Sequence, residues 1–340
     1  MRELVIVISD LYLGGEADAA PSGGAPQGLP GLERVARFAG VRAPERNWRA
    51  WCARWFGLAR HAQLPPASIA AVGRSVPGES VWCATPLHLV AGVGRLHLQR
   101  RGRLQLASEP LAQLAADFNS EFGGGGFALA PLDSGECLLG APGGLSARTV
   151  DPARVPQMAF IEALPSGADA AWLRRLGAEI ELWLHAHPLN AARARRGEPQ
   201  LSQLWIWGGG QAGLCGAEEP GARAHTTVFG ADAYLTGLVR LAGGQSAPLE
   251  QWSPAGATSR AGAALLTLEI AEPLRRAPGG SLTEALAALD RQWVVPALAA
   301  LADGAFERLT VLANDRLWQL GRRDQLRRWR RHRVGLEALT

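Results

Sequence analysis

A continuous apolar run at the start of the chain constrains the fold more than any other feature. Residues 4–8 read Leu-Val-Ile-Val-Ile, and the run ends at Ser9-Asp10. Because polar residues do not alternate within it, the run predicts a strand that is buried on both faces, as in a parallel sheet covered by helices. Ligands bind at the carboxyl ends of strands in open α/β sheets, so we expect Asp10 to lie at a ligand-binding edge.

Later segments alternate between strand and helix patterns. We predict strands at 204–207, 263–270 and 308–313, and helices at 32–40, 169–185, 231–242 and 281–301. This order favours an α/β fold with a doubly wound, mostly parallel sheet.

A change of the hydrophobic pattern in the first half of the chain predicts a second, smaller domain. Short strand-like runs surround a helical stretch at 111–122. The predicted organisation is a first part of the α/β core at 1–79, an α+β insertion domain at 80–141, a linker at 142–156, and a second part of the core at 157–340 that ends in a basic helix.

The composition is that of a globular protein. Hydrophobic residues make up 47% of the chain and charged residues 19%, which argues against wholesale disorder. The four cysteines are far apart in sequence and form no Cys-x-x-Cys pair. No uninterrupted apolar stretch approaches the roughly 20 residues of a membrane-spanning helix, and the chain starts directly on a strand pattern. We therefore expect a cytoplasmic protein without a membrane partner.

The basic residues are all arginine, a bias that a GC-rich coding genome explains. Seven of them gather near the C-terminus: Arg322, Arg323, Arg327, Arg328, Arg330, Arg331 and Arg333. Such a cluster attracts phosphates or an acidic partner. Nucleic-acid binding through this segment is one alternative, and a solvated helix that carries Leu326 and Trp329 is the other.

The most distinctive segment runs from His185 to Gly210 and contains His187-Pro188-Leu189-Asn190, Arg193 and Leu204-Trp205-Ile206-Trp207-Gly208-Gly209-Gly210. Pro188 favours an extended His187 and ends the preceding helix. Glycines after a strand offer backbone N–H groups to an anion, and an arginine pairs with a phosphate. The candidate ligand-binding residues are His187, Asn190, Arg193, Gly208, Gly209 and Gly210. In the competing interpretation, Asn190 caps a turn, His187 is satisfied internally, and the glycines allow close packing.

This segment resembles the central motif of the cofactor-independent phosphoglycerate mutases, in which His-Pro-x-Asn ends a helix, an arginine follows, and a strand runs into a glycine-rich turn. A closer likeness is to bacterial phosphoglycerate mutase-type proteins and RpfE-type regulatory proteins, whose strand reads Leu-Trp-Leu-Trp-Gly-Gly-Gly. The arginine- and tryptophan-rich stretch near Trp48 and the Ala84-Thr85-Pro86-Leu87-His88-Leu89 stretch share this likeness. The resemblance implies an alkaline phosphatase-like core, two divalent cations and a serine that carries the phosphoryl group.

The ligands that the resemblance implies are largely missing. Asp10 matches the aspartate of the first strand, and Asp315 matches one in the last strand, where Ala313-Asn314-Asp315-Arg316 stands in place of Gly-Asp-His. The later strand ends in Glu269-Ile270-Ala271-Glu272-Pro273 without a histidine, and Ser68 lacks the Gly-Ser-Asp context of the nucleophile. Asp10 and Asp315 are therefore predicted to be vestigial metal ligands.

These patterns predict a degenerate phosphoglycerate mutase-like protein that is non-catalytic and has a regulatory or small phosphorylated-ligand-binding role. The alternative is an active metal-dependent phosphotransferase with rebuilt ligands. We expect no cofactor, with a single Mg²⁺ or Mn²⁺ on the two carboxylates as the other outcome. The expected partner is a small phosphorylated ligand or another protein rather than nucleic acid.

Overall fold

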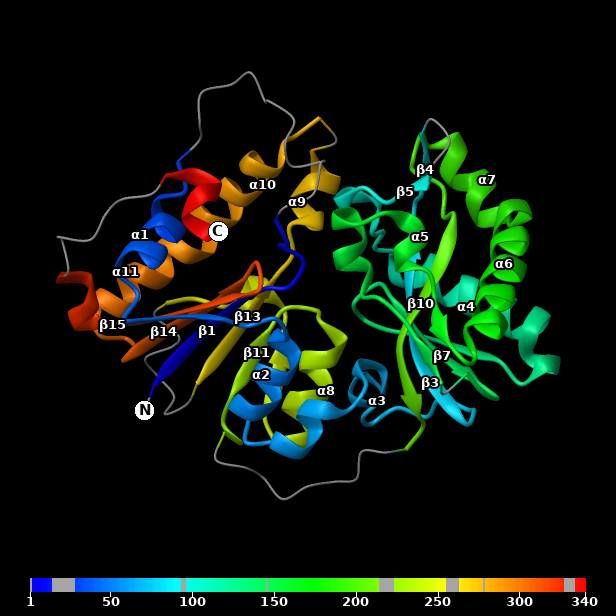
Figure 1. Ribbon diagram of the computed structural model, residues 1–340, viewed down its shortest axis with the longest axis horizontal. Coiled ribbons are helices and arrows are strands. Elements are labelled where there is room, and N and C mark those ends of the chain that lie inside the picture. The colour runs from blue at the N-terminus through cyan, green and yellow to red at the C-terminus, as the bar shows by residue number, and fades with distance from the viewer. Residues whose placement is uncertain are drawn as a thin grey trace. The chain divides into compact units, whose positions relative to one another are not determined.

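The computed structural model describes residues 2–13, 28–92, 96–144, 146–213, 223–254, 263–277, 279–326 and 334–340. The chain divides into two compact units (Figure 1). Unit 1 consists of Met1–Ala62, Glu218–Asp232 and Val239–Thr340, and unit 2 of Gln63–Ala217 and Ala233–Leu238. Each unit has its own sheet and is described by itself.

A mixed, mostly parallel seven-stranded sheet forms the centre of unit 1, in the order β12-β11-β13-β1-β14-β15-β2. Its strands are β1 (Glu3–Ile8), β2 (Val41–Pro44), β11 (Thr227–Phe229), β12 (Gln245–Ala247), β13 (Ala264–Leu268), β14 (Arg308–Ala313) and β15 (Arg316–Gly321). The first strand, β1, pairs in parallel with β13 on one side and with β14 on the other, whereas β15 pairs antiparallel with both β14 and β2. The predicted α/β class with a mostly parallel sheet is confirmed.

Helices cover both faces of this sheet (Figure 1). They are α1 (Pro30–Phe38), α2 (Trp48–Trp55), α9 (Ala271–Arg276), α10 (Leu282–Leu289), a π-helix (Asp290–Val294), α11 (Val295–Asp303) and the 3-10 helix η10 (Gly335–Leu339). Leu4, Ile6 and Ile8 of β1 share one core with α1, α10 and α11. On the opposite face, the Trp55 indole of α2 donates a hydrogen bond to Glu3 (3.0 Å).

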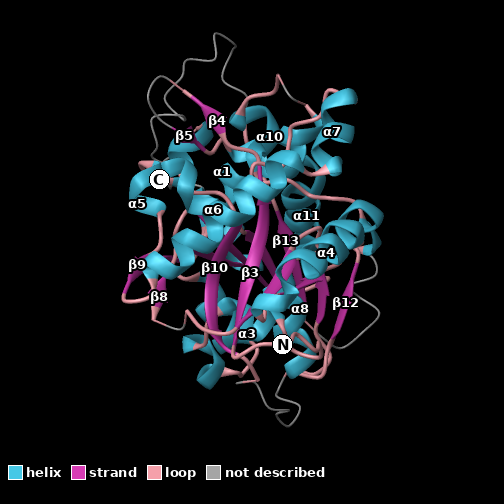
Figure 2. Ribbon diagram, turned by 90° about the vertical axis from the view of Figure 1, so that its right-hand side faces the viewer, coloured by secondary structure: helices cyan, strands magenta, loops and turns pink. Residues whose placement is uncertain are grey.

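Unit 2 is built on a four-stranded antiparallel sheet in the order β10-β3-β7-β6. The strands of this unit are β3 (Ser80–Leu87), β4 (Val90–Ala91), β5 (Leu96–His97), β6 (Ala128–Pro131), β7 (Cys137–Ala141), β8 (Ala147–Arg148), β9 (Ser166–Gly167) and β10 (Gln203–Gln211). Its helices are α3 (Pro66–Ala70), α4 (Ser108–Phe122), α5 (Phe160–Ala163), α6 (Ala170–Ala186) and α7 (Pro188–Arg195), and α8 (Ala233–Leu241) crosses the division between the units. Figure 2 shows β10 and β3 side by side.

The sequence places the strand at 204–207 in the main parallel sheet, and that placement is wrong. Strand β10 pairs antiparallel with β3 in unit 2. Leu204 and Ile206 belong to one hydrophobic core, and Trp205 and Trp207 to another, so β10 is buried on both faces. Burial on both faces produces the same apolar run in either kind of sheet, which is why periodicity alone did not separate them. The predicted bounds of the insertion, 80–141, stay a prediction.

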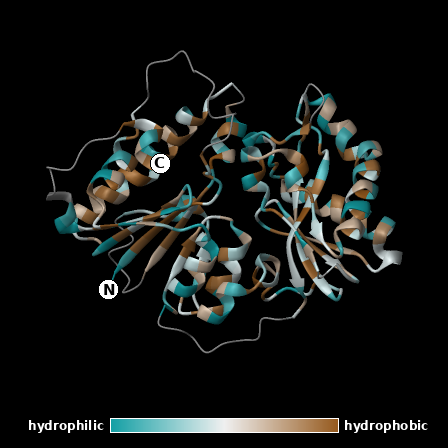
Figure 3. Cartoon of the chain, in the orientation of Figure 1, coloured by the Kyte–Doolittle hydropathy of each residue, from teal (hydrophilic) through white to brown (hydrophobic). Residues whose placement is uncertain are grey.

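Most of the predicted helices and strands lie where their hydrophobic pattern indicates, and Figure 3 shows brown residues along the strands of both sheets. The strands that were not predicted are β2, β4, β8, β9, β11, β12 and β15. Of the predicted basic C-terminal helix, Arg322–Leu326 is a 3-10 helix, and residues 327–333 lie outside the described part of the chain. Residues 14–27, which follow β1, also lie outside it.

One helical stretch among the described residues, Leu282–Asp303, is long and apolar enough to cross a membrane by length and composition alone. It is 22 residues long, and 61% of its most apolar window is buried inside the protein. It comprises α10, the π-helix and α11, whose apolar residues form the core of unit 1. Its apolarity is therefore that of a core helix.

Asp290 connects this core helix to the start of α1. The residue has no exposed surface, and its two carboxylate oxygens accept hydrogen bonds from the N–H groups of Gly31 (2.8 Å) and Leu32 (2.7 Å). Burial raises the pKa of the Asp290 carboxyl above its usual range, although both hydrogen bonds act in the opposite direction. The carboxylate takes the place of an N-cap for α1, whose preceding residue Leu29 makes no side-chain cap.

We expect Asp290→Ala to lower the free energy of unfolding by about 2–4 kcal/mol, because two buried N–H groups lose their acceptor. Asp290→Asn keeps one acceptor and should lose less. Chemical denaturation monitored by circular dichroism measures both values. Asp303→Ala, an exposed change in α11, serves as the control, and an equal effect of Asp303→Ala and Asp290→Ala would contradict the capping role.

Candidate functional site

Asp10 lies at the carboxyl end of β1, as its place after the apolar run predicts. Both oxygens of its carboxylate accept hydrogen bonds from backbone N–H groups of the same protein. The residue is buried, with 4% of its surface exposed. One oxygen accepts a hydrogen bond from the N–H of Ile270 (2.7 Å), and the other from the N–H of Ala271 (2.9 Å). These two donors begin α9, which follows β13 directly. Asp10 therefore caps a helix start, where a negative charge is stabilised.

Asp315 belongs to a tight turn between β14 and β15. Ala313 and Arg316 face each other at the end of the hairpin, and Asn314 and Asp315 between them have φ angles of 50° and 54°. Two consecutive residues with positive φ are the mark of a type I′ hairpin turn, a conformation that asparagine and aspartate tolerate. The backbone carbonyl of Asp315 accepts a hydrogen bond from the N–H of Glu45 (2.7 Å).

Sequence analysis did not single out Asn314, which organises this end of the sheet. Its backbone N–H donates to the Leu11 carbonyl (2.8 Å). Its side-chain oxygen accepts from the Leu13 N–H (2.8 Å), and its amide nitrogen donates to the Leu339 carbonyl (2.8 Å). One side chain thus connects the segment after β1 to the C-terminal turn. The signal in the sequence was an Asn-Asp pair directly after a predicted strand, because these two residue types tolerate the positive φ of a tight turn.

Described residues at this sheet edge line a small cavity. A cavity of about 10 Å³ lies between the Asn314-Asp315 turn and the residues Tyr12, Glu45 and Trp48. Such a volume accommodates about one water molecule. Within the described ranges, no three His, Cys, Asp or Glu side chains come together as potential metal ligands.

The two other positions of the implied catalytic apparatus have structural contacts. Glu272, in α9, forms an ion pair with Arg276 one turn later (2.6 Å). Ser68, in α3, is buried, and its hydroxyl donates to the Gln211 carbonyl (3.2 Å). The surroundings of Ser68 are the packed backbone of β10 rather than a helix start that is open to substrate.

In unit 2, His187 caps the start of α7. Its Nδ1 accepts a hydrogen bond from the Leu189 N–H (3.2 Å), so the neutral ring carries its proton on Nε2. That nitrogen lies 3.3 Å from Oδ2 of Asp117 in α4. The ring also packs edge-on against Trp183, with centroids 4.6 Å apart. His187 therefore links α4, α6 and α7.

Asn190 and Arg193 hold the loop between α7 and β10. The Asn190 amide donates to the carbonyls of Leu184 and Leu201 (both 2.8 Å) and accepts from the Leu201 N–H (2.7 Å). The guanidinium of Arg193 donates to the Pro199 carbonyl (2.7 Å) and pairs with Glu198 (3.2 Å). Partial burial lowers the pKa of Arg193, while Glu198 acts in the opposite direction. The ligand-binding role of His187, Asn190 and Arg193 stays a prediction, and each side chain has an internal partner.

The three glycines allow β10 to approach its neighbours closely. Gly208 has a φ of +62°, and its N–H donates to the Thr149 hydroxyl (2.9 Å). A Cβ at Gly209 would overlap the Trp82 ring, and one at Gly210 would overlap Pro65. The strand pairing also shifts register between Trp207 and Gly210. Close packing and a bulge therefore account for all three glycines, and their anion-binding role stays a prediction.

Asp10 and Asp315 belong to unit 1, whereas the His187 to Gly210 residues belong to unit 2.

Comparisons with known proteins give only distant likenesses. No protein-family model matches the chain, and no curated protein matches it. The cofactor-independent phosphoglycerate mutase from Thermoplasma acidophilum DSM 1728 is similar in structure at 16% identity and a TM-score of 0.39, covering 94% of this chain and 89% of that one. The PH0037 protein of Pyrococcus horikoshii is similar at 14% identity and a TM-score of 0.45, covering 99% and 91%. The family likeness, RpfE-type regulatory proteins included, stays a prediction.

We expect Gly209→Ala to destabilise the protein by about 1–3 kcal/mol or more, because the added methyl group overlaps the buried Trp82 ring. The midpoint of chemical denaturation reports the change. Gly143→Ala is the matched control, since a Cβ there meets no atom within 4 Å. A Gly209→Ala protein as stable as Gly143→Ala would show that β10 does not need this close approach.

Proposed function

We propose that this protein is a phosphoglycerate mutase-like regulatory protein, which binds a small phosphorylated ligand and does not catalyse two-metal phosphoryl transfer. The observation that carries the proposal is the state of Asp10, whose two carboxylate oxygens accept backbone N–H groups at the start of α9. The first-strand aspartate serves as a helix cap in this chain.

The chemistry of phosphoryl transfer explains why this observation matters. Two cations clamp the attacking and leaving oxygens, and carboxylates and histidines must hold both of them. Recruiting Asp10 to such a site would remove the acceptor of two buried N–H groups, at a cost of about 1–3 kcal/mol for each group. Asp315 lies in a turn beside a cavity of about 10 Å³. The described residues at this edge therefore do not fit a pair of metal ions.

Arg316 supports the binding part of the proposal. It follows Asp315, at the position where the family resemblance implies a histidine ligand. A guanidinium carries a permanent positive charge and binds phosphate oxygens in pairs, whereas it does not coordinate a cation. Replacement of a metal ligand by arginine changes this place from one that binds cations to one that attracts anions.

A single Mg²⁺ or Mn²⁺ ion and a cytoplasmic location remain predictions from the sequence.

Nucleic-acid binding remains the weaker alternative. The five arginines at 327–333 that would carry it lie outside the described residues. No described contact favours this function over the binding of a small ligand.

We expect the purified full chain to show no turnover of 3-phosphoglycerate or p-nitrophenyl phosphate in the presence of Mn²⁺. Product formation is followed by coupled spectrophotometric assay and by absorbance, and Asp10→Asn provides the background. Calorimetry should detect binding of 3-phosphoglycerate to the same preparation. Mn²⁺-dependent turnover that Asp10→Asn abolishes would reject the proposal in favour of an active phosphotransferase.

A further inference from the structure

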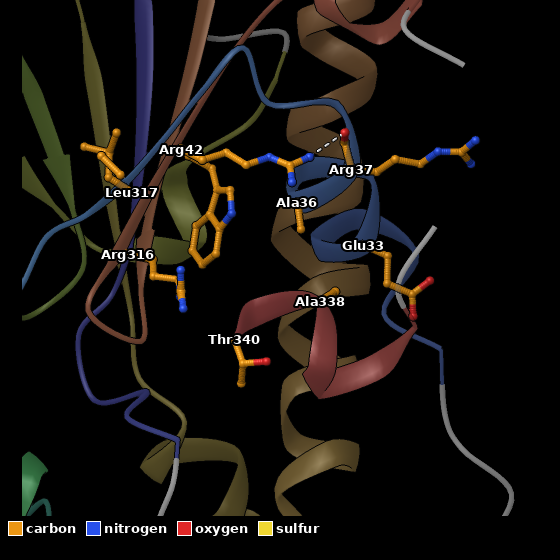
Figure 4. A pocket seen from close by; sticks show the side chains of 10 residues that line it. Glu33, Ala36, Arg37, Arg42, Arg316, Leu317, Ala338 and Thr340 are labelled. Atoms are coloured by element: carbon orange, nitrogen blue, oxygen red, sulfur yellow. Dashed lines mark hydrogen bonds between the residues drawn. The ribbon is translucent and has the colours of Figure 1, made fainter. Parts of the chain in front are cut away.

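A cavity of about 590 Å³ lies within unit 1, between α1, strand β15, the edge strand β2, and η10 (Figure 4). Charged and polar side chains contribute much of its lining, among them Glu33, Arg37, Arg42, Arg316 and Thr340. Trp318, Ala36 and Ala338 provide an apolar part of the wall. The volume is within the range of about 300–1,000 Å³ that is usual for small-molecule sites.

The strand register brings two arginines to one face of the sheet. Arg316 and Trp318 are two residues apart in β15, so their side chains share a face. Trp318 is the register partner of Arg42 in β2, and Arg316 is the partner of Pro44. Arg42 and Arg316 are therefore diagonal neighbours, whose separation in an antiparallel pair is about 7–8 Å. Two arginine side chains at this spacing can reach a single phosphate group.

The two guanidinium groups differ in how they are held. Arg42 donates to the Arg37 carbonyl (2.6 Å), which fixes its direction along the cavity wall (Figure 4). The side chain of Arg316 is exposed, and it forms neither a hydrogen bond nor an ion pair with any described residue. Arg316 is thus a permanent cation that remains available to a ligand.

The other charged groups on the wall are already engaged. Glu33 is buried, and its Oε1 accepts hydrogen bonds from the N–H groups of Leu29 (3.0 Å) and Gly335 (2.8 Å). The Arg37 side chain extends away from Arg42 and Arg316 in Figure 4, and its guanidinium lies 5.0 Å from the centroid of the Phe38 ring. Arg42 and Arg316 therefore supply the positive charge of this part of the cavity wall.

We infer that this cavity, which we call the Arg42–Arg316 pocket, binds the phosphate group of a small organic phosphate monoester. The inference rests on the proposed function and assigns a binding site to its ligand. A phosphate dianion has enough oxygens to accept paired hydrogen bonds from both guanidinium groups, whereas a carboxylate has only two. The remaining volume beside Trp318 and the two alanines accommodates the organic part of the ligand, which inorganic phosphate lacks.

Calorimetry on the full chain tests the pocket with three probes: 3-phosphoglycerate, inorganic phosphate and glycerate. We expect 3-phosphoglycerate to bind at least tenfold more tightly than either of the others. Arg316→Ala and Arg42→Ala should each weaken its binding at least tenfold, and Arg316→Lys should weaken it less, because lysine keeps the charge but not the paired donors. Higher salt should weaken binding to the wild type.

Arg34→Ala is the matched control, since Arg34 is an exposed arginine of α1 whose side chain does not line the pocket. It removes the same charge and should bind like the wild type. Circular dichroism verifies that each variant is folded. Hydrogen exchange provides a second measurement, with slower exchange expected in residues 334–340 when 3-phosphoglycerate is bound.

The outcomes separate this inference from the proposed function. Equal affinity of the wild type and Arg316→Ala for 3-phosphoglycerate would overturn the assignment of the ligand to this pocket and leave the proposed function in place. Equal affinity for inorganic phosphate or glycerate would overturn the assignment of an organic phosphate ligand. Mn²⁺-dependent turnover would overturn the proposed function, whereas tenfold weaker binding by Arg316→Ala would still support the pocket.

Discussion

The parallel pairing of β1 with β13 on one side and β14 on the other determines which residues meet at the carboxyl ends of these strands in unit 1. Because the three strands run in the same direction, their carboxyl ends lie together. The chain continues from β13 into α9 and from β14 into a two-residue turn. Asp10 follows β1, and its carboxylate accepts hydrogen bonds from the N–H groups of Ile270 and Ala271 at the start of α9. At this edge, the carboxylate of Asp10 is consequently hydrogen-bonded to the backbone of the protein.

The antiparallel pairing of β15 with β14 and β2 brings Arg42 and Arg316 to the same cavity. In this register, Trp318 is opposite Arg42, and Arg316 shares the face of Trp318. Helix α1 and η10 cover the same face, and they enclose the cavity between them. A long buried helix supports this arrangement, because Asp290 accepts the first N–H groups of α1. The position of the Arg42–Arg316 pocket thus depends on contacts among four separate segments.

The local interpretations of the His187 to Gly210 segment succeed to different degrees. His187 and Asn190 cap and connect neighbouring turns, which a histidine before a proline and an asparagine near a helix start already suggested. The overlap between a side chain at Gly209 and the Trp82 ring could not be predicted, because Trp82 lies on a different strand. Assignment of this strand to the parallel sheet failed for a related reason. Burial on both faces identifies a strand but not its neighbours.

By itself, the sequence determined most of the long buried strands and amphipathic helices, since hydrophobic periodicity reports burial of each segment independently of its partners. It also shows Glu272 and Arg316 at positions where the family resemblance implies histidine ligands. Only the tertiary structure decided that Asp10 caps α9, that Asn314 organises the strand end, and that Arg42 and Arg316 share a pocket. The physical reason is that hydrogen bonds and charge clusters of this kind form between segments far apart in the chain, and no local pattern records which segments meet.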